Sequence, residues 1–237
     1  MAKRDRPRAL RYVGGNVRKV AHRTATAAQV IGRLEPGLRV TGVTAAQFSA
    51  IDALEHMVNE LGPGEVRIST WTTGLYDVHR ARSLRAARRI ADIRMLLDRW
   101  QFEKSPKYAG ALIEALGIHS IRCVPVHAKV VVVTGEHGAA AFRSSMNLNK
   151  NLRTEQFDLD VDDAVAGFYA KWFDELWAES ARSQDNRTII RSVYDRFRRG
   201  VEEEAPREQK RPRRPRARAP KLAEVLFSPD DLSGLID

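Results

Sequence analysis

The chain has 237 residues, of which 43% are hydrophobic and 30% charged, and its formal net charge is +10. That length and composition are typical of a globular protein with one large core or two small ones. No apolar run reaches the roughly 18 residues of a membrane-spanning helix, so we expect no membrane attachment. The single cysteine, Cys123, can form neither an internal disulfide nor a zinc site, and the Arg-rich start is not a secretory signal. The sequence therefore predicts a cytoplasmic protein.

The positive charge is concentrated in two segments. Residues 1–23 carry eight lysines and arginines and one acid, and residues 205–221 carry the same numbers. The stretch between them has no net charge, and residues 222–237 carry four acids and no base. Basic arms of this kind commonly contact the phosphates of a nucleic acid without reading its sequence. The alternative is that they serve only as linkers or solubility tails.

The order of the expected elements predicts an α/β domain over residues 24–200. Residues 1–23 are expected to form an extended basic arm, because Gly14-Gly15 interrupts any helix. After a short helix turn and a first strand, helices and strands alternate. The expected helices are 48–61, 80–90, 105–116, 162–176 and 183–199, and the expected strands are 66–73, 93–97, 119–126 with 129–133 (one long strand or two), 139–142 and 156–161. This alternation predicts a mixed β-sheet flanked by helices on both faces.

Beyond residue 200 the composition changes to glutamates and then to Pro/Arg repeats, which cannot build a core. We therefore predict a basic Pro/Arg-rich linker at residues 201–221. Residues 222–237 regain apolar side chains among acids and form a short C-terminal segment. A segment of this kind docks onto a protein partner or back onto its own domain. The alternative is a loosely packed terminal helix.

One stretch carries the candidate catalytic residues. His127 and Lys129 lead into a run of four valines, which predicts a strand buried on both faces. Because strand side chains alternate, His127 and Lys129 should project from the same face. The residues Ser144-Ser145-Met146-Asn147 and then Glu155 follow at a short distance. A histidine, a cation, neutral donors and a carboxylate are the groups that phosphoryl transfer uses.

These residues resemble the signature of the phospholipase D superfamily, which is written H-x-K-x(4)-D, followed by G-S/G-x-N and a downstream glutamate. His127-Ala128-Lys129 matches the first part and Ser145-Met146-Asn147 the second. Glu155 falls where the family has its acid. The resemblance covers roughly residues 44–180 and implies a single phospholipase D-like lobe.

The resemblance implies a metal-independent phosphodiesterase that needs no cofactor. His127 would attack phosphorus in one subunit and act as general acid and base in the other. Lys129, Ser145 and Asn147 would hold the phosphate oxygens, and Glu155 would orient the imidazole. Family members need two such motifs, and this chain has one His-x-Lys, so the resemblance implies a homodimer with a shared site. One-lobe members are mostly nucleases, so the implied substrate is DNA or RNA, with phospholipid the less favoured alternative.

Two positions depart from the signature. Thr134 stands where the family has an aspartate whose role is mainly structural. Ser144 replaces the glycine that usually precedes the serine, and its side chain would crowd the backbone beside a bound phosphate. These departures keep a second interpretation open, in which the chain is a catalytically weak or inactive phospholipase D-like protein that binds nucleic acid.

Two groups of arginines are further candidates for nucleic-acid contact. Those on one predicted helix either line a groove or form a solvated face: Arg82, Arg85 and Arg89. A second group lies in the C-terminal arm and either contacts nucleic-acid phosphates or belongs only to a linker or solubility tail: Arg211, Arg213 and Arg214.

The surroundings of the motif leave two further alternatives open. Asp158 and Asp160 lie near Glu155 on a predicted strand and compete with it for the role of the acid. Trp71, at the end of an early strand, either borders the site or packs in the core. The aromatic residues of the helix at 162–176 are expected to be core or dimer contacts rather than base-stacking groups.

Overall fold

The computed structural model describes residues 8–13, 16–21, 26–149, 153–182 and 184–204. All described elements belong to one structural unit, Met1–Glu202, except for the last two described residues. The predicted C-terminal segment and most of the predicted linker, with Arg211, Arg213 and Arg214, lie outside the described residues. In the described part of the chain, no helix is both long enough and apolar enough to span a membrane.

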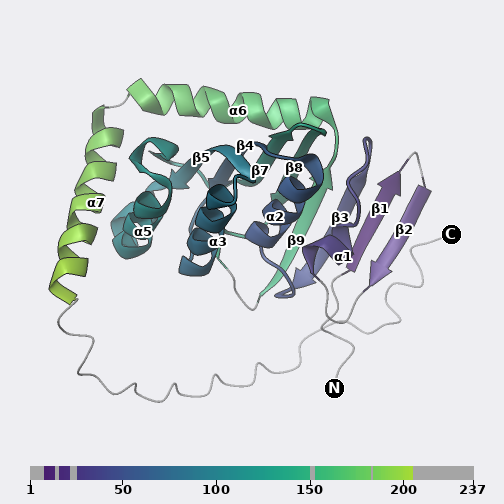
Figure 1. Cartoon of the computed structure of the whole chain (residues 1–237), viewed down its shortest axis with the longest axis horizontal. Coiled ribbons are helices and arrows are strands. Elements are labelled where there is room, and N and C mark those ends of the chain that lie inside the picture. Colours follow the sequence, from purple (N-terminus) through teal and green to yellow (C-terminus); the bar gives the residue numbers. More distant parts are fainter. Residues whose placement is uncertain (1–7, 14–15, 22–25, 150–152, 183, 205–237) are drawn as a thin grey trace, which may run out of the picture. The chain divides into compact units, whose positions relative to one another are not determined.

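Among the described residues, nine strands form one mixed sheet, and helices cover both of its faces, which confirms the predicted fold class (Figure 1). The strands are β1 Arg8–Val13, β2 Asn16–Ala21, β3 Arg39–Ala45, β4 Gly64–Thr70, β5 Ile90–Asp98, β6 Ile121–Val124, β7 Lys129–Gly135, β8 Gly138–Ser144 and β9 Thr154–Asp160. The helices are α1 Ala27–Ile31, α2 Ala50–Leu61, α3 Leu75–Ala86, α4 Arg99–Lys104, α5 Pro106–Leu116, the 3₁₀ turn η1 Ile118–Ser120, α6 Asp163–Arg182 and α7 Gln184–Glu204. The strand order is β2-β1-β3-β9-β8-β7-β4-β5-β6. The strands β4, β5 and β6 are parallel to one another, and β4 is antiparallel to β7.

The first two strands correct the prediction of an extended arm over residues 1–23. β1 and β2 pair in antiparallel register, and β1 continues the sheet beside β3. The sequence signal is the Gly14-Gly15 pair between two runs that contain valines, because two glycines suit the two-residue turn of a hairpin. The sheet therefore begins before the boundary predicted at residue 24.

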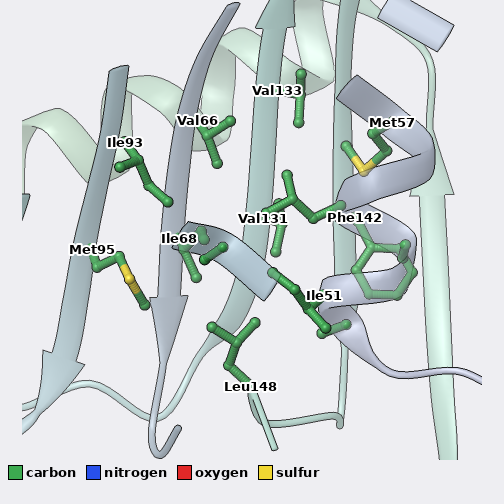
Figure 2. Close-up of a cluster of buried hydrophobic side chains, with 14 of the residues drawn as sticks. Ile51, Met57, Val66, Ile68, Ile93, Met95, Val131, Val133, Phe142 and Leu148 are labelled. Carbon is green, nitrogen blue, oxygen red and sulfur yellow. The ribbon is translucent and has the colours of Figure 1, made fainter. Parts of the chain in front are cut away.

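The valine run forms the centre of the core, because β7 is buried on both faces. Val131 and Val133 pack with apolar side chains of α2, β4 and β5 (Figure 2). Val130 and Val132 point to the opposite face, where Ala166 of α6 contacts them. A continuous run of β-branched residues predicts this environment, because both faces of such a strand are removed from water.

The structure decides between two predicted alternatives and corrects one predicted helix. The segment 119–133 is two strands rather than one long strand, with β6 at an edge of the described sheet and β7 in its interior. Pro125 cannot donate to a strand ladder, so pairing stops there. The helix predicted at 80–90 is α3, which ends at Ala86, because Arg88 adopts a positive φ of 56° before β5 begins.

The connection between β6 and β7, residues 125–128, crosses the ends of two other strands. β5 and β4 lie between β6 and β7, so the connection spans three strand spacings, about 14 Å in all. Five Cα–Cα steps separate Val124 from Lys129, and an extended chain covers about 17 Å in five steps. The connection is therefore largely extended, which limits the backbone positions that His127 can take.

A side chain of α7 closes the edge of the sheet at β6. Cys123 donates its backbone N–H to Asn186 Oδ1 at 3.4 Å, and Asn186 Nδ2 donates to the carbonyl of Cys123. The amide thus takes the place of a neighbouring strand, since β6 is the last strand on that side of the described sheet. Cys123 is a buried apolar group, as predicted, and burial raises the pKa of its thiol to about 11.

We predict that Asn186→Ala destabilises the fold by about 1–3 kcal/mol, because it leaves the buried N–H and C=O of Cys123 without partners. Urea unfolding measures the loss as a shift in the midpoint. Asn59→Ala is the matched control, because Asn59 is exposed on α2. Equal losses in the two variants would contradict the role assigned to Asn186.

Candidate active site

The predicted motif residues gather at one end of the sheet. β4, β5, β6 and β8 end there, and β7 and β9 begin there. Lys129 is the first residue of β7, and its ladder partner is Ser144, the last residue of β8. Ser144 pairs in turn with Phe157 of β9, two residues beyond Glu155. The strand order therefore brings Lys129, Ser145 and Glu155 to the same end on three adjacent strands.

His127 lies in the connection before β7, not on the strand itself, and is exposed. Lys129 Nζ is 3.0 Å from Nδ1 and 3.2 Å from Nε2 of the imidazole ring, and it donates to the His127 carbonyl at 2.8 Å. The two side chains therefore meet, as their spacing predicts. An ammonium group has donors only, so it can bond only to a ring nitrogen that carries no proton. The arrangement places the ammonium group of Lys129 directly against the imidazole ring of His127.

Two hydrogen bonds fix the connection that carries His127. The N–H of Val126 donates to Asp98 Oδ2 at 2.9 Å, and Ser69 Oγ donates to the carbonyl of Ala128 at 2.9 Å. Asp98 ends β5 and Ser69 lies near the end of β4, the two strands that the connection crosses. Sequence reasoning missed both residues. Asp98 could have been found as a helix N-cap, because its carboxylate also accepts a hydrogen bond from the backbone N–H of Trp100 in the first turn of α4.

Glu155 accepts a hydrogen bond from Ser145 Oγ. The same hydroxyl accepts from the N–H of Gln156 at 3.0 Å, and the N–H of Ser145 donates to the Gln156 carbonyl at 3.1 Å. The start of β9 thus holds the serine of the motif in place. The predicted contact between Glu155 and His127 stays a prediction.

Asn147 lies in the loop after β8, which is bonded to the segment after β4. The N–H of Leu148 donates to the Thr72 carbonyl and to Thr70 Oγ1, each at 3.1 Å. The N–H of Gly74 donates to the Leu148 carbonyl at 2.7 Å. Asn147 Oδ1 is buried and has no hydrogen-bond partner among the described residues. An unpaired buried acceptor costs about 1–3 kcal/mol, and proteins keep such arrangements mainly at functional sites.

The residues that depart from the motif lie away from the other motif residues or bond within their own loop. Thr134 is five steps along β7 from Lys129, which is about 16 Å in a strand. Ser144 Oγ accepts from the N–H of Met146 at 3.1 Å and so stabilises its own turn. The competing acid Asp160 ends β9 at the far end of the sheet, where it pairs with two arginines.

The structure does not bring the arginines of the helix predicted at 80–90 to this end of the sheet. α3 runs away from the site, and Arg89 precedes Ile90, the first residue of β5 at the far end. Arg85 Nη1 donates to the carbonyl of Leu116, the last residue of α5. Arg82 and Arg89 are exposed. Contact between these arginines and nucleic acid stays a prediction.

One tryptophan lies beside His127, and a second lies beside the first. The ring of Trp71, which directly follows β4, is centred 5.3 Å from the imidazole, so Trp71 borders the site. The ring of Trp100 is centred 5.0 Å from that of Trp71. Sequence reasoning missed Trp100 because α4, with six residues, is too short to show a helical period.

Burial lowers the pKa of Lys129, and the carboxylates of Glu155 and Asp98 oppose that shift. The lysine is therefore a partly desolvated cation with two acids near it. Desolvation strengthens the attraction between such a cation and an anion that enters the site.

We predict that Glu155→Gln lowers the pKa of Lys129 further, because the variant removes the carboxylate that most favours the ammonium form. NMR titration of the lysine side chains measures this pKa. Glu136→Gln is the matched control, since Glu136 is exposed in the turn between β7 and β8, and it should leave the value unchanged. A raised or constant pKa in Glu155→Gln would refute the assignment.

No protein-family model and no curated protein matches the chain. Among solved structures, it is similar to Nuc from Salmonella typhimurium, a phospholipase D family member, with a TM-score of 0.37 and 14% identity over 48% of this chain and 78% of that chain. It is also similar to TrmBL2, an archaeal chromatin protein, with a TM-score of 0.38 and 12% identity over 54% of this chain and 49% of that chain. Scores of this size establish no family membership, so we infer function from the side chains.

Proposed function

We propose that the protein is a phosphodiesterase that cleaves nucleic-acid phosphodiester bonds through a phosphohistidine at position 127. The observation that carries this proposal is the contact of Lys129 Nζ with the imidazole of His127, at 3.0 and 3.2 Å from its two nitrogens. A nucleophilic nitrogen needs an available lone pair, and the ammonium beside it needs an anion. A phosphodiester supplies both the electrophilic phosphorus and the negative charge.

The first chemical step joins the bare ring nitrogen of His127 to phosphorus and breaks the bond from phosphorus to the leaving oxygen. Lys129 exchanges its hydrogen bonds to the ring for bonds to the non-bridging oxygens, where Asn147 also donates and Ser145 donates after its hydroxyl turns from Glu155. The leaving oxygen takes a proton from a general acid. Water then gives a proton to the group that acted as the general acid and attacks phosphorus, the N–P bond breaks, and the imidazole is restored.

A second copy of the chain is the proposed source of the general acid. Within the described part of the chain, no other histidine contacts the pair formed by His127 and Lys129. A homodimer about a two-fold axis would place one His127 opposite the other. One imidazole would then act as the nucleophile and the other as the acid and base.

Nucleic acid is the proposed substrate because of the charge of the whole chain. The net charge is +10, and residues 1–23 and 205–221 each carry eight lysines and arginines. Such segments favour a polyanion with many phosphates over a single phospholipid headgroup. Thr134 and Ser144 motivate the alternative of a binding protein without turnover, but neither substitution removes a group from the site.

We expect the wild type to cleave DNA or RNA in excess chelator and His127→Ala to be slower by a factor on the order of 10³ or more. His137→Ala is the matched control, because His137 is exposed in the turn at the other end of β7, and it should keep the wild-type rate. Mass spectrometry after an alkaline quench should detect the adduct at His127. Salt-sensitive binding without cleavage or adduct would support the binding protein instead.

A further inference from the structure

Three rings form a row that begins at the proposed nucleophile. The Trp71 ring is centred 5.3 Å from the imidazole of His127 at an interplanar angle of 48°. The Trp100 ring is centred 5.0 Å from that of Trp71 at an angle of 38°. His127 is exposed, Trp71 is partly exposed and Trp100 is 40% exposed, so the row lies at the surface of the protein.

One carboxylate fixes this row relative to the nucleophile. Asp98 Oδ1 accepts from the backbone N–H of Trp100 at 2.8 Å, and Asp98 Oδ2 accepts from the N–H of Val126 at 2.9 Å. The first bond caps α4, and the second holds the connection that carries His127. The position of Trp100 and that of the nucleophile are therefore set by the same residue at the end of β5.

Packing alone does not explain why Trp100 is here. Large side chains that serve the core of this protein are almost fully buried, as Phe102 shows two residues later in the same short helix, with 1% exposure. Trp100 instead presents much of its indole to water, which forfeits hydrophobic stabilisation. An exposed aromatic face beside a phosphate-binding group is the usual platform on which a nucleobase stacks.

We infer that Trp71 and Trp100 bind a nucleobase next to the scissile phosphate, and that the substrate is single-stranded nucleic acid. The inference rests on the proposed function, because it places the phosphate at His127 and Lys129. In a duplex, neighbouring bases cover both faces of each base, so an indole can stack only on an unpaired base or at a strand end. Every base has an aromatic face, so the contact selects strandedness rather than sequence.

The test measures binding with His127→Ala protein, which cannot turn the substrate over. Fluorescence anisotropy measures the affinity for three DNA probes: a single-stranded oligonucleotide, its duplex, and the same strand with abasic sites. The single strand and the duplex are also tested as RNA. We expect the single strand to bind more tightly than the duplex. Adding Trp100→Ala should weaken binding of the base-containing strand by roughly 5- to 150-fold and leave the abasic strand unaffected. Trp100→Phe, which keeps an aromatic face, should retain most of the affinity.

Phe168→Ala is the matched control, because Phe168 is an exposed aromatic residue on α6, with 68% exposure, and should change nothing. Equal binding of single strand and duplex would overturn the inference, as would the same loss for base-containing and abasic strands in Trp100→Ala. If strand discrimination through Trp100 holds while wild-type protein fails to cleave, the stacking platform is supported and the proposed catalytic function is refuted. The two hypotheses therefore fail separately.

Discussion

The extended connection between β6 and β7, residues 125–128, is the constraint on which the candidate site depends. β7 carries valines on both faces and must therefore lie inside the sheet, whereas β6 lies at its edge. Four residues must then carry the chain across the ends of β5 and β4, which requires them to be almost extended. His127 is positioned by the order of the strands beneath it and by the bonds to Asp98 and Ser69, although its own side chain is exposed.

Charged groups have different roles at the two ends of the sheet. At the far end, the buried carboxylate of Asp160 pairs with Arg39 and Arg143, which joins β3, β8 and β9. At the site, Lys129 bonds to the histidine and, in the described part of the chain, forms no ion pair with a carboxylate. Its charge is offset only at longer range by Glu155 and Asp98. Carboxylates and arginines thus pair directly at one end of the sheet, whereas Lys129 at the other end contacts the histidine.

Sequence patterns predicted most of this architecture, because strand and helix periods are local properties. The buried strand at residues 129–133, the alternation of elements and the approach of Lys129 to His127 all follow from spacing. The hairpin of β1 and β2 could also have been predicted, because a Gly-Gly pair such as Gly14-Gly15 is typical of a two-residue hairpin turn.

The supports of the site could not be predicted in the same way. Ser69 bonds to the carbonyl of Ala128, 59 residues away, and nothing in the sequence around Ser69 distinguishes it from any other strand serine. Trp100 reaches the site through a helix too short to have a period, and the bond from Ser145 to Glu155 depends on how β8 and β9 pair. These relations are tertiary, so they become visible only when the strand order is known.

Thr134 and Lys129 share a strand, but they belong to different surroundings. Position 134 pairs with Glu65 of β4 and Ala139 of β8, so it belongs to the strand pairing at the far end of the sheet. A sequence pattern that runs from His127 to position 134 therefore spans two separate environments, the candidate site at one end of β7 and strand pairing at the other. A change at position 134 acts on the pairing with β4 and β8 and leaves the residues around Lys129 in place.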